Sequence, residues 1–221
     1  MSTGAHPSPR VRDGMLAAIP LAPGPVLFGL TFGVLAQASG IGAVAAVVMS
    51  ATTFAGSAQF AAASVLDSGG TAAAAIMAAV FLNARYAAIS VTVASIFPGG
   101  RARRLLESQL IVDESWALSG RSGTFEWPIL VGAGVLLYAL WVSSTALGTL
   151  VGGVLHDPNA LGLDSAFAVL FLGLTFPYLR ERRAREAATL AALITTALVP
   201  IVPSGIPIVA AAAACLLGLR R

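Results

Sequence analysis

The run Thr71–Phe97 reads TAAAAIMAAVFLNARYAAISVTVASIF and is apolar over almost its whole length. A helix needs about 20 mostly apolar residues to cross a hydrocarbon core of about 30 Å, so this run predicts a transmembrane helix. Asn83 and Arg85 lie near its middle. A cation at that depth costs at least ~2.5 kcal/mol, so Arg85 must face protein, water or an anion rather than lipid.

The whole chain has the composition of an integral membrane protein. Of its 221 residues, 57% are hydrophobic and 10% are charged, against roughly 25% charged in a soluble domain. Such a chain cannot cover itself with polar side chains in water. We therefore expect one all-α transmembrane domain over residues 1–221, with a cytoplasmic tail at residues 1–13 and a polar, amphipathic loop at residues 99–126.

The positive charge of the chain points to membrane topology and not to nucleic acid. All 13 cationic side chains belong to arginine. Most cluster at the ends of apolar segments, at residues 10–12, 101–104, 180–185 and 220–221. Cytoplasmic loops of multi-pass membrane proteins carry such clusters, which places the chain in a lipid bilayer.

About seven apolar segments predict a polytopic helical bundle. They are Met15–Gln37, Ile41–Leu66, Thr71–Phe97, Pro128–Leu155, Leu163–Leu179, Ala187–Val202 and Ile206–Leu219. If all arginine clusters are cytoplasmic, an even number of crossings must separate neighbouring clusters. Three segments lie between the first two clusters, so one of them must enter and leave on the same side, unless the polar loop hides a further partial span.

The best candidate for this irregular segment is Ile41–Leu66. It is interrupted by Ala55-Gly56-Ser57-Ala58-Gln59, which predicts a broken or re-entrant helix. Irregular backbone at membrane depth is tolerated only where it is buried in protein or lines a watery cavity. A break here would expose backbone N–H groups inside the membrane.

Two small-residue motifs recur at a spacing that favours close helix packing. Gly29–Gly33 and Gly148–Gly152 each match GxxxG, which lets two helix backbones approach closely. The motifs lie near the start of each half of the chain. This placement suggests an inverted repeat, a frequent plan in transporters.

Three groups of polar residues are candidates for a substrate site. Arg85 would pair with an anionic guest or an internal acid. Gly56 would free the backbone, while Ser57 and Gln59 would bind a polar head group or, alternatively, join helices. Asn83 would share a site with Arg85 only if the helix unwinds locally, because residues two apart point to different faces.

Two adjacent acids in the polar loop are candidates for proton coupling or ammonium binding. Asp113 and Glu114 lie in an amphipathic stretch. A carboxyl group near apolar surface has a raised pKa and can bind a proton near neutral pH. The alternative is an ordinary solvated helix at the membrane interface.

The sequence offers little for an enzyme. Gly120–Gly123 matches the GxSG of intramembrane serine proteases, but both histidines lie in polar segments, at His6 and His156. No HExxH motif, nucleotide-binding loop or Cys/His cluster is present in the sequence, and Cys215 is the single cysteine. We therefore expect no enzymatic activity, no metal and no cofactor.

Taken in order, these motifs resemble the AzlC family, the large subunit of bipartite branched-chain amino acid exporters. The resemblance rests on Gly56-Ser57-Ala58-Gln59-Phe60, Asn83-Ala84-Arg85, Asp113-Glu114, Trp141, the Gly148–Gly152 motif and Gly162-Leu163-Asp164. It covers roughly Arg12 to Arg180. The sequence departs from the family pattern at one position, since Tyr86 follows the arginine where the family often carries histidine.

The resemblance implies proton-driven export of Leu, Ile and Val, and of other apolar amino acids such as Met, across the bacterial inner membrane. It also implies a small AzlD-type membrane subunit as partner. In this reading Arg85 holds the substrate carboxylate, and Asp113 or Glu114 binds the ammonium group or the coupling proton. A passive channel and a structural subunit of a membrane complex are the alternatives.

Overall fold

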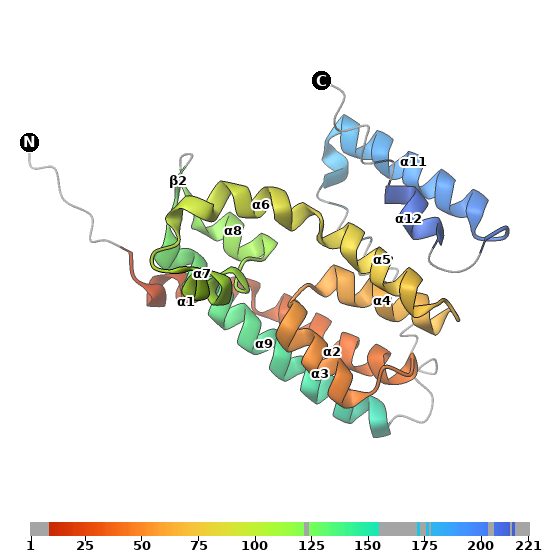
Figure 1. Cartoon of the computed structure of the whole chain (residues 1–221), viewed down its shortest axis with the longest axis horizontal. Coiled ribbons are helices and arrows are strands. Elements are labelled where there is room, and N and C mark those ends of the chain that lie inside the picture. The colour runs from red at the N-terminus through yellow and green to blue at the C-terminus, as the bar shows by residue number, and fades with distance from the viewer. Residues whose placement is uncertain are drawn as a thin grey trace, which may run out of the picture.

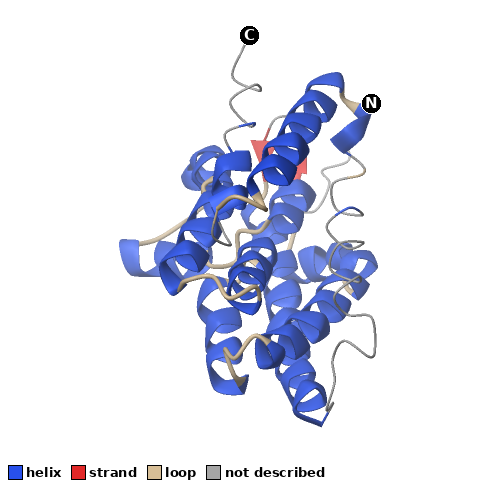
Figure 2. Cartoon of the chain, turned by 90° about the vertical axis from the view of Figure 1, so that its right-hand side faces the viewer, coloured by secondary structure: helices blue, strands red, loops and turns tan. Residues whose placement is uncertain are grey.

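The computed structural model describes residues 9–121, 124–154, 178–202 and 206–212, with single positions at 172, 176 and 214. This part of the chain is mostly helical (Figures 1 and 2). The helices are α1 Val11–Ala18, η1 Ile19–Leu21, α2 Pro23–Ala38, α3 Ala43–Thr53, α4 Gly56–Asp67, α5 Ala72–Asn83, α6 Arg85–Val93, η2 Ala94–Ile96, α7 Arg101–Ser108, α8 Asp113–Ser119, α9 Trp127–Val154, η4 Tyr178–Arg180, α11 Arg182–Leu198 and α12 Ile206–Ala212. A short antiparallel pair, β1 Gly120–Arg121 and β2 Thr124–Phe125, precedes α9.

Two described helical stretches are long and apolar enough to cross a membrane. They are Ala72–Ile96 and Trp127–Gly152, which match two of the predicted segments. The first begins with a cap, since the Thr71 hydroxyl accepts a hydrogen bond from Ala74 N at 3.2 Å. The predicted segment Leu163–Leu179 lies almost entirely outside the described residues, so the count of seven stays a prediction.

The first predicted segment is bent and not straight. Val11–Leu21 and Pro23–Ala38 meet at an angle of 67° and together would make a third span. Pro20, Pro23 and Pro25 lie at the bend. Proline removes a backbone donor and clashes with the preceding turn, which explains the interruption.

Helix α9 packs against both α1 and α2, on the two sides of their bend. The two predicted GxxxG motifs face each other across this contact. A Cβ atom at Gly33 would lie 2.6 Å from Thr149 N, and one at Gly148 would collide with the backbone of Leu30. Only glycine permits this approach, so the predicted packing role of both motifs is confirmed. The inverted repeat stays a prediction.

The predicted break in Ile41–Leu66 is confirmed. Helix α3 ends at Thr53 and α4 begins at Gly56. Between them Phe54 adopts left-handed backbone angles, with φ of 41°, and Ala55 has φ of −139° and ψ of 83°. These two non-helical residues together reverse the direction of the chain. The outer ends of α3 and α4 lie at the same end of the molecule (Figure 1). The segment is therefore a helical hairpin that returns to the side from which it came.

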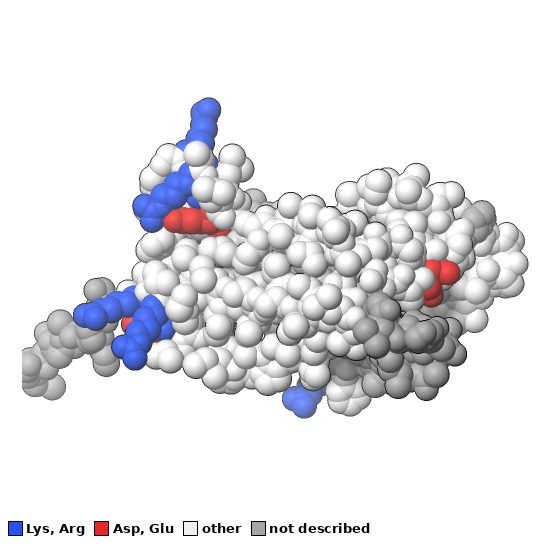
Figure 3. Space-filling model, turned by 90° about the horizontal axis from the view of Figure 1, so that it is seen from below, with Lys and Arg blue, Asp and Glu red and all other residues white. Residues whose placement is uncertain are grey.

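The opposite end of the molecule is basic. Helix α1 and the amphipathic helix α7 lie at this end (Figure 1). Figure 3 shows arginine side chains gathered there, while the middle of the same face carries almost no charge. The positive-inside rule predicts that this end of the helices is cytoplasmic, and that orientation stays a prediction.

The last helices pack together as a hairpin. Helix α11 contacts α12, and the two lie side by side in Figure 1. We predicted an apolar segment at Ala187–Val202, but the helix starts five residues earlier and includes Arg182, Arg183 and Arg185. Arginine is a good helix former, so the basic cluster extends the helix instead of forming a loop.

Candidate functional site

The turn of the α3–α4 hairpin lies beside the boundary between α5 and α6, where Ser57 contacts Arg85. The hairpin turns at Phe54 and Ala55. The span Ala72–Ile96 divides into α5 and α6 at Ala84, whose backbone keeps helical angles, with φ of −56° and ψ of −28°. Helix α4 therefore starts close to Arg85, the first residue of α6, and its first-turn N–H groups lack acceptors within the helix.

Arg85 connects three elements that are distant in sequence. Its Nη2 lies 2.7 Å from Asp113 Oδ2 at the start of α8. The same nitrogen donates to Ser57 Oγ on α4 at 3.2 Å and to Tyr86 Oη at 3.4 Å. The guanidinium carbon also lies 5.1 Å from the centre of the Tyr86 ring, within the range of a cation–π contact.

The ion pair differs in one respect from our expectation. We expected an anionic guest to neutralise Arg85, but in the structure the internal acid Asp113 does so. The pair is nevertheless open, since the side chain of Arg85 is 43% exposed and that of Asp113 is 41% exposed. Both charges therefore have a free side from which a ligand could contact them.

Gln59 lies in a buried polar network and not beside Arg85. Its Oε1 accepts from Trp141 Nε1 at 3.1 Å and from Ala55 N at 3.3 Å. Its Nε2 donates to Ser50 Oγ at 2.9 Å, and Ser50 in turn shares a hydrogen bond of 3.0 Å with Thr145 Oγ1. The network joins α3, α4 and α9 across the hairpin turn.

Gly56 serves the same contact with α9. A Cβ atom there would stand 2.8 Å from Cη2 of Trp141, so glycine makes room for the indole ring. Gln59 is fully buried, and its amide oxygen already accepts two hydrogen bonds. The geometry gives Gly56 and Gln59 the role of fixing the hairpin turn, which positions Ser57 for Arg85.

Replacing Gln59 by leucine should destabilise the protein by about 1–3 kcal/mol, because buried donors on Ala55 and Trp141 would lose their acceptor. Thermal unfolding in detergent measures this change. The control is Gln109→Leu, since Gln109 is only half-buried and donates to Thr52 O at 2.7 Å. Equal unfolding temperatures of the two variants would show that the network does not hold the turn.

Glu114 lies next to the ion pair in a different environment. The residue is exposed on one side, but surrounding protein displaces water from its carboxyl group and raises its pKa, and the charge of Asp113 adds to this. Arg85 and a backbone hydrogen bond act in the opposite direction. The raised pKa disposes Glu114 to bind a proton.

Asn83 is the last residue of α5. Its Oδ1 is buried and accepts no hydrogen bond from any described residue. The local unwinding that we required for Asn83 and Arg85 to share a site is not seen, because Ala84 between them keeps helical backbone angles. The two side chains therefore point to different faces of the helix.

Four residues of this region were not among the predicted site residues: Ser50, Thr145, Trp141 and Tyr86. Ser50 and Thr145 are short polar residues within apolar segments, and this position was the one feature of the sequence that could have indicated a buried polar contact. Trp141 entered the analysis only through the family resemblance, although a buried indole N–H needs a partner. Tyr86 was noted only as a departure from the family.

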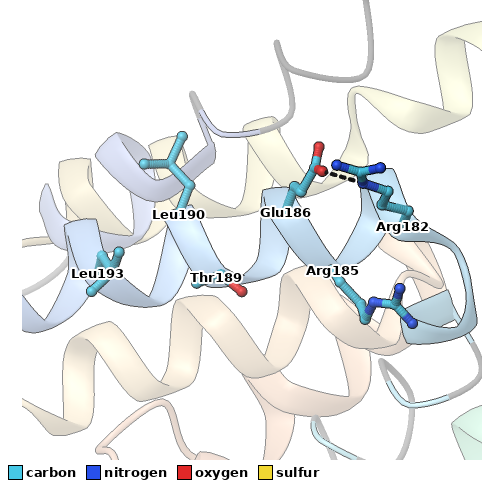
Figure 4. A pocket seen from close by; sticks show the side chains of 6 residues that line it. All are labelled: Arg182, Arg185, Glu186, Thr189, Leu190 and Leu193. Atoms are coloured by element: carbon cyan, nitrogen blue, oxygen red, sulfur yellow. Dashed lines mark hydrogen bonds and ion pairs between the residues drawn. The ribbon is translucent and has the colours of Figure 1, made fainter.

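A shallow hollow lies along α11, away from Arg85 and Asp113. Its lining side chains, drawn in Figure 4, all belong to this single helix. The charged pair there, Arg182 Nε to Glu186 Oε1 at 3.0 Å, has side chains that are 86% and 54% exposed. Among the described residues no group of three acids, histidines or cysteines is arranged to hold a metal ion.

The fold and the site define a helical integral membrane protein with a polar site at the junction of interrupted helices. The chain belongs to the AzlC family, since the family model described as AzlC protein matches residues 20–155. The resemblance drawn from the motifs is thereby confirmed. No solved structure matches the chain.

The chain is similar to membrane proteins of several organisms. A membrane protein of Archaeoglobus fulgidus is 32% identical, over 80% of this chain and 80% of its own length. A membrane protein of Helicobacter pylori is 23% identical over 74% and 73%. The branched-chain amino acid transport protein AzlC of Bacillus subtilis is 24% identical over 80% and 72%. The family and this last name suggest a membrane transport protein.

Proposed function

We propose that the protein is a secondary transporter that exports branched-chain amino acids, and other apolar amino acids such as methionine, across the bacterial inner membrane. The relative named as a branched-chain amino acid transport protein supports this substrate class. The observation that carries the proposal is the half-exposed pair of Arg85 and Asp113 beside the turn of the α3–α4 hairpin. Helices that are broken near the middle of the membrane form the substrate sites of many transporters.

The ion pair matches the two charges of an amino acid. The substrate carboxylate binds Arg85 and the first-turn N–H groups of α4, while the ammonium group binds Asp113. On binding, Arg85 exchanges Asp113 for the substrate carboxylate, and Asp113 exchanges Arg85 for the substrate ammonium group. All four charges are therefore paired in the complex. Charge-assisted hydrogen bonds of this kind contribute about 1.5–3 kcal/mol each.

The expected partner is a small AzlD-type membrane subunit, which the family resemblance suggests. Exposed apolar residues on several helices, Val44, Val91 and Leu150 among them, leave ample surface for lipid or for such a subunit. The experiment is leucine efflux from cells that express this chain with and without a candidate subunit. Efflux above that of empty cells supports the proposal, and its absence in both cases refutes it.

Glu114 is proposed to carry the coupling proton. Because its pKa is raised, its protonated form persists above the ordinary value of 4.5 and is lost as the pH rises through the raised pKa. Leucine efflux should therefore change with pH in this window and respond to an imposed pH gradient. In Glu114→Gln both dependences should disappear, whereas Glu186→Gln, on α11, should retain them. Wild-type flux that ignores the pH gradient would indicate a passive channel.

A further inference from the structure

An apolar groove begins beside the turn of the α3–α4 hairpin and the boundary between α5 and α6. It has a volume of about 770 Å³ and lies between the α3–α4 hairpin and α5. At its inner end are Thr53, Asn83 and Ala84. Ala84 directly precedes Arg85 in the chain, so the inner end of the groove lies one residue from the arginine of the ion pair.

The outer end of the groove lies at the ends of the same helices. Ile41 precedes α3 and Leu66 lies near the end of α4, and both line it. A helix of 11 or 12 residues is about 17 Å long, roughly half of a hydrocarbon core of about 30 Å. The groove therefore has the length of a path from the middle of a membrane to one surface.

The direction of this path follows from the chain. Helix α1 starts at the basic end, and the outer ends of α3 and α4 lie at the opposite end (Figure 1). That end is extracytoplasmic under the positive-inside rule. The groove thus leads from the ion pair toward the outside.

The walls of the groove suit an aliphatic side chain. Small residues, among them Ala62 and Ala79, leave the space open, and Met49 supplies an adaptable apolar surface. The buried Oδ1 of Asn83 has no hydrogen-bond partner among the described residues. An unpaired buried acceptor calls for a partner, and a polar group at the inner end of the groove would supply one.

We infer that this groove holds the branched aliphatic side chain of an amino acid whose charged groups contact Arg85 and Asp113, and that it is the outward half of the transport path. The inference rests on the proposed function. It adds a side-chain subsite with Asn83, Ala79 and Ala62 as determinants of specificity.

The test is cysteine labelling with a matched control on the same helix. Cys215, the single native cysteine, is replaced by serine, and Ala79→Cys is compared with Met77→Cys. Met77 is 47% exposed and is not part of the groove, so it would face lipid. A thiol reacts as its thiolate, which forms in water and hardly at all in lipid.

In membrane vesicles, Ala79→Cys should react several-fold faster than Met77→Cys with a small hydrophilic thiol reagent, and leucine should slow only the first reaction. An unfolding temperature in detergent close to that of the Cys215→Ser parent shows that the Ala79→Cys variant is folded. Equal reactivity at the two positions, or a rate at position 79 that leucine leaves unchanged, overturns the inference. If efflux still depends on Arg85 in that case, the proposed function stands and only the groove is wrong.

Discussion

Replacing Arg85 by alanine should lower leucine efflux by about 10- to 150-fold, the equivalent of one charge-assisted hydrogen bond of 1.5–3 kcal/mol. The variant loses the cation that would hold the substrate carboxylate. It also leaves Asp113 without its partner at 2.7 Å. The measurement is efflux from cells in which the amount of protein in the membrane has been matched to wild type.

The control for this variant is Arg182→Ala. Arg182 makes an ion pair of similar geometry with Glu186, but its side chain is 86% exposed. Exposed pairs contribute about 0–1 kcal/mol, so this variant should transport normally. Wild-type efflux in Arg85→Ala would remove the carboxylate role, and an equal loss in both variants would point to a general effect of charge.

Replacing Gly148 by alanine should destabilise the protein by about 1–3 kcal/mol or more, because an added methyl group forces packed backbones apart. The Cβ atom would meet the backbone of Leu30 on α2 and not a flexible side chain. Thermal unfolding in detergent measures the change. A marginally stable protein would also lose abundance in the membrane.

The matched control is Gly24→Ala in α2. A Cβ atom at Gly24 meets only the side chain of Phe28, at 3.9 Å. Alanine is a better helix former than glycine by up to about 1 kcal/mol, so this variant should be as stable as wild type or slightly more stable. If the two variants unfold at the same temperature, the contact between α2 and α9 is looser than described.

Local features of the fold could be predicted because their causes lie within short stretches of sequence. The run from Thr71 to Phe97 could be predicted as a helix because an apolar segment in a membrane must pair its backbone N–H and C=O groups with each other, and a helix does so. The break predicted at Ala55–Gln59 followed from an odd number of segments together with a Gly-Ser-Gln interruption. In the structure the turn lies at Phe54 and Ala55, with Phe54 in a left-handed conformation, and Gly56–Gln59 already belong to α4.

Contacts between distant residues could not be predicted. Arg85 and Asp113 were both candidates, but nothing local shows that α6 and the start of α8 meet. We expected Gln59 to bind a polar head group or to join helices. The sequence alone could not decide between these roles, because it does not show which partners a buried amide finds. Its partners Ser50 and Trp141 lie on two other helices, so the network exists only in the folded bundle.

The most direct test of the central claim is the binding of leucine and two analogues to the purified protein by calorimetry. Isocaproate lacks the ammonium group, and isoamylamine lacks the carboxylate. If Arg85 and Asp113 hold the two ends of a zwitterion, each analogue should bind at least about tenfold more weakly than leucine, since each loses one charge-assisted contact. Binding of either analogue as tightly as leucine would contradict the account.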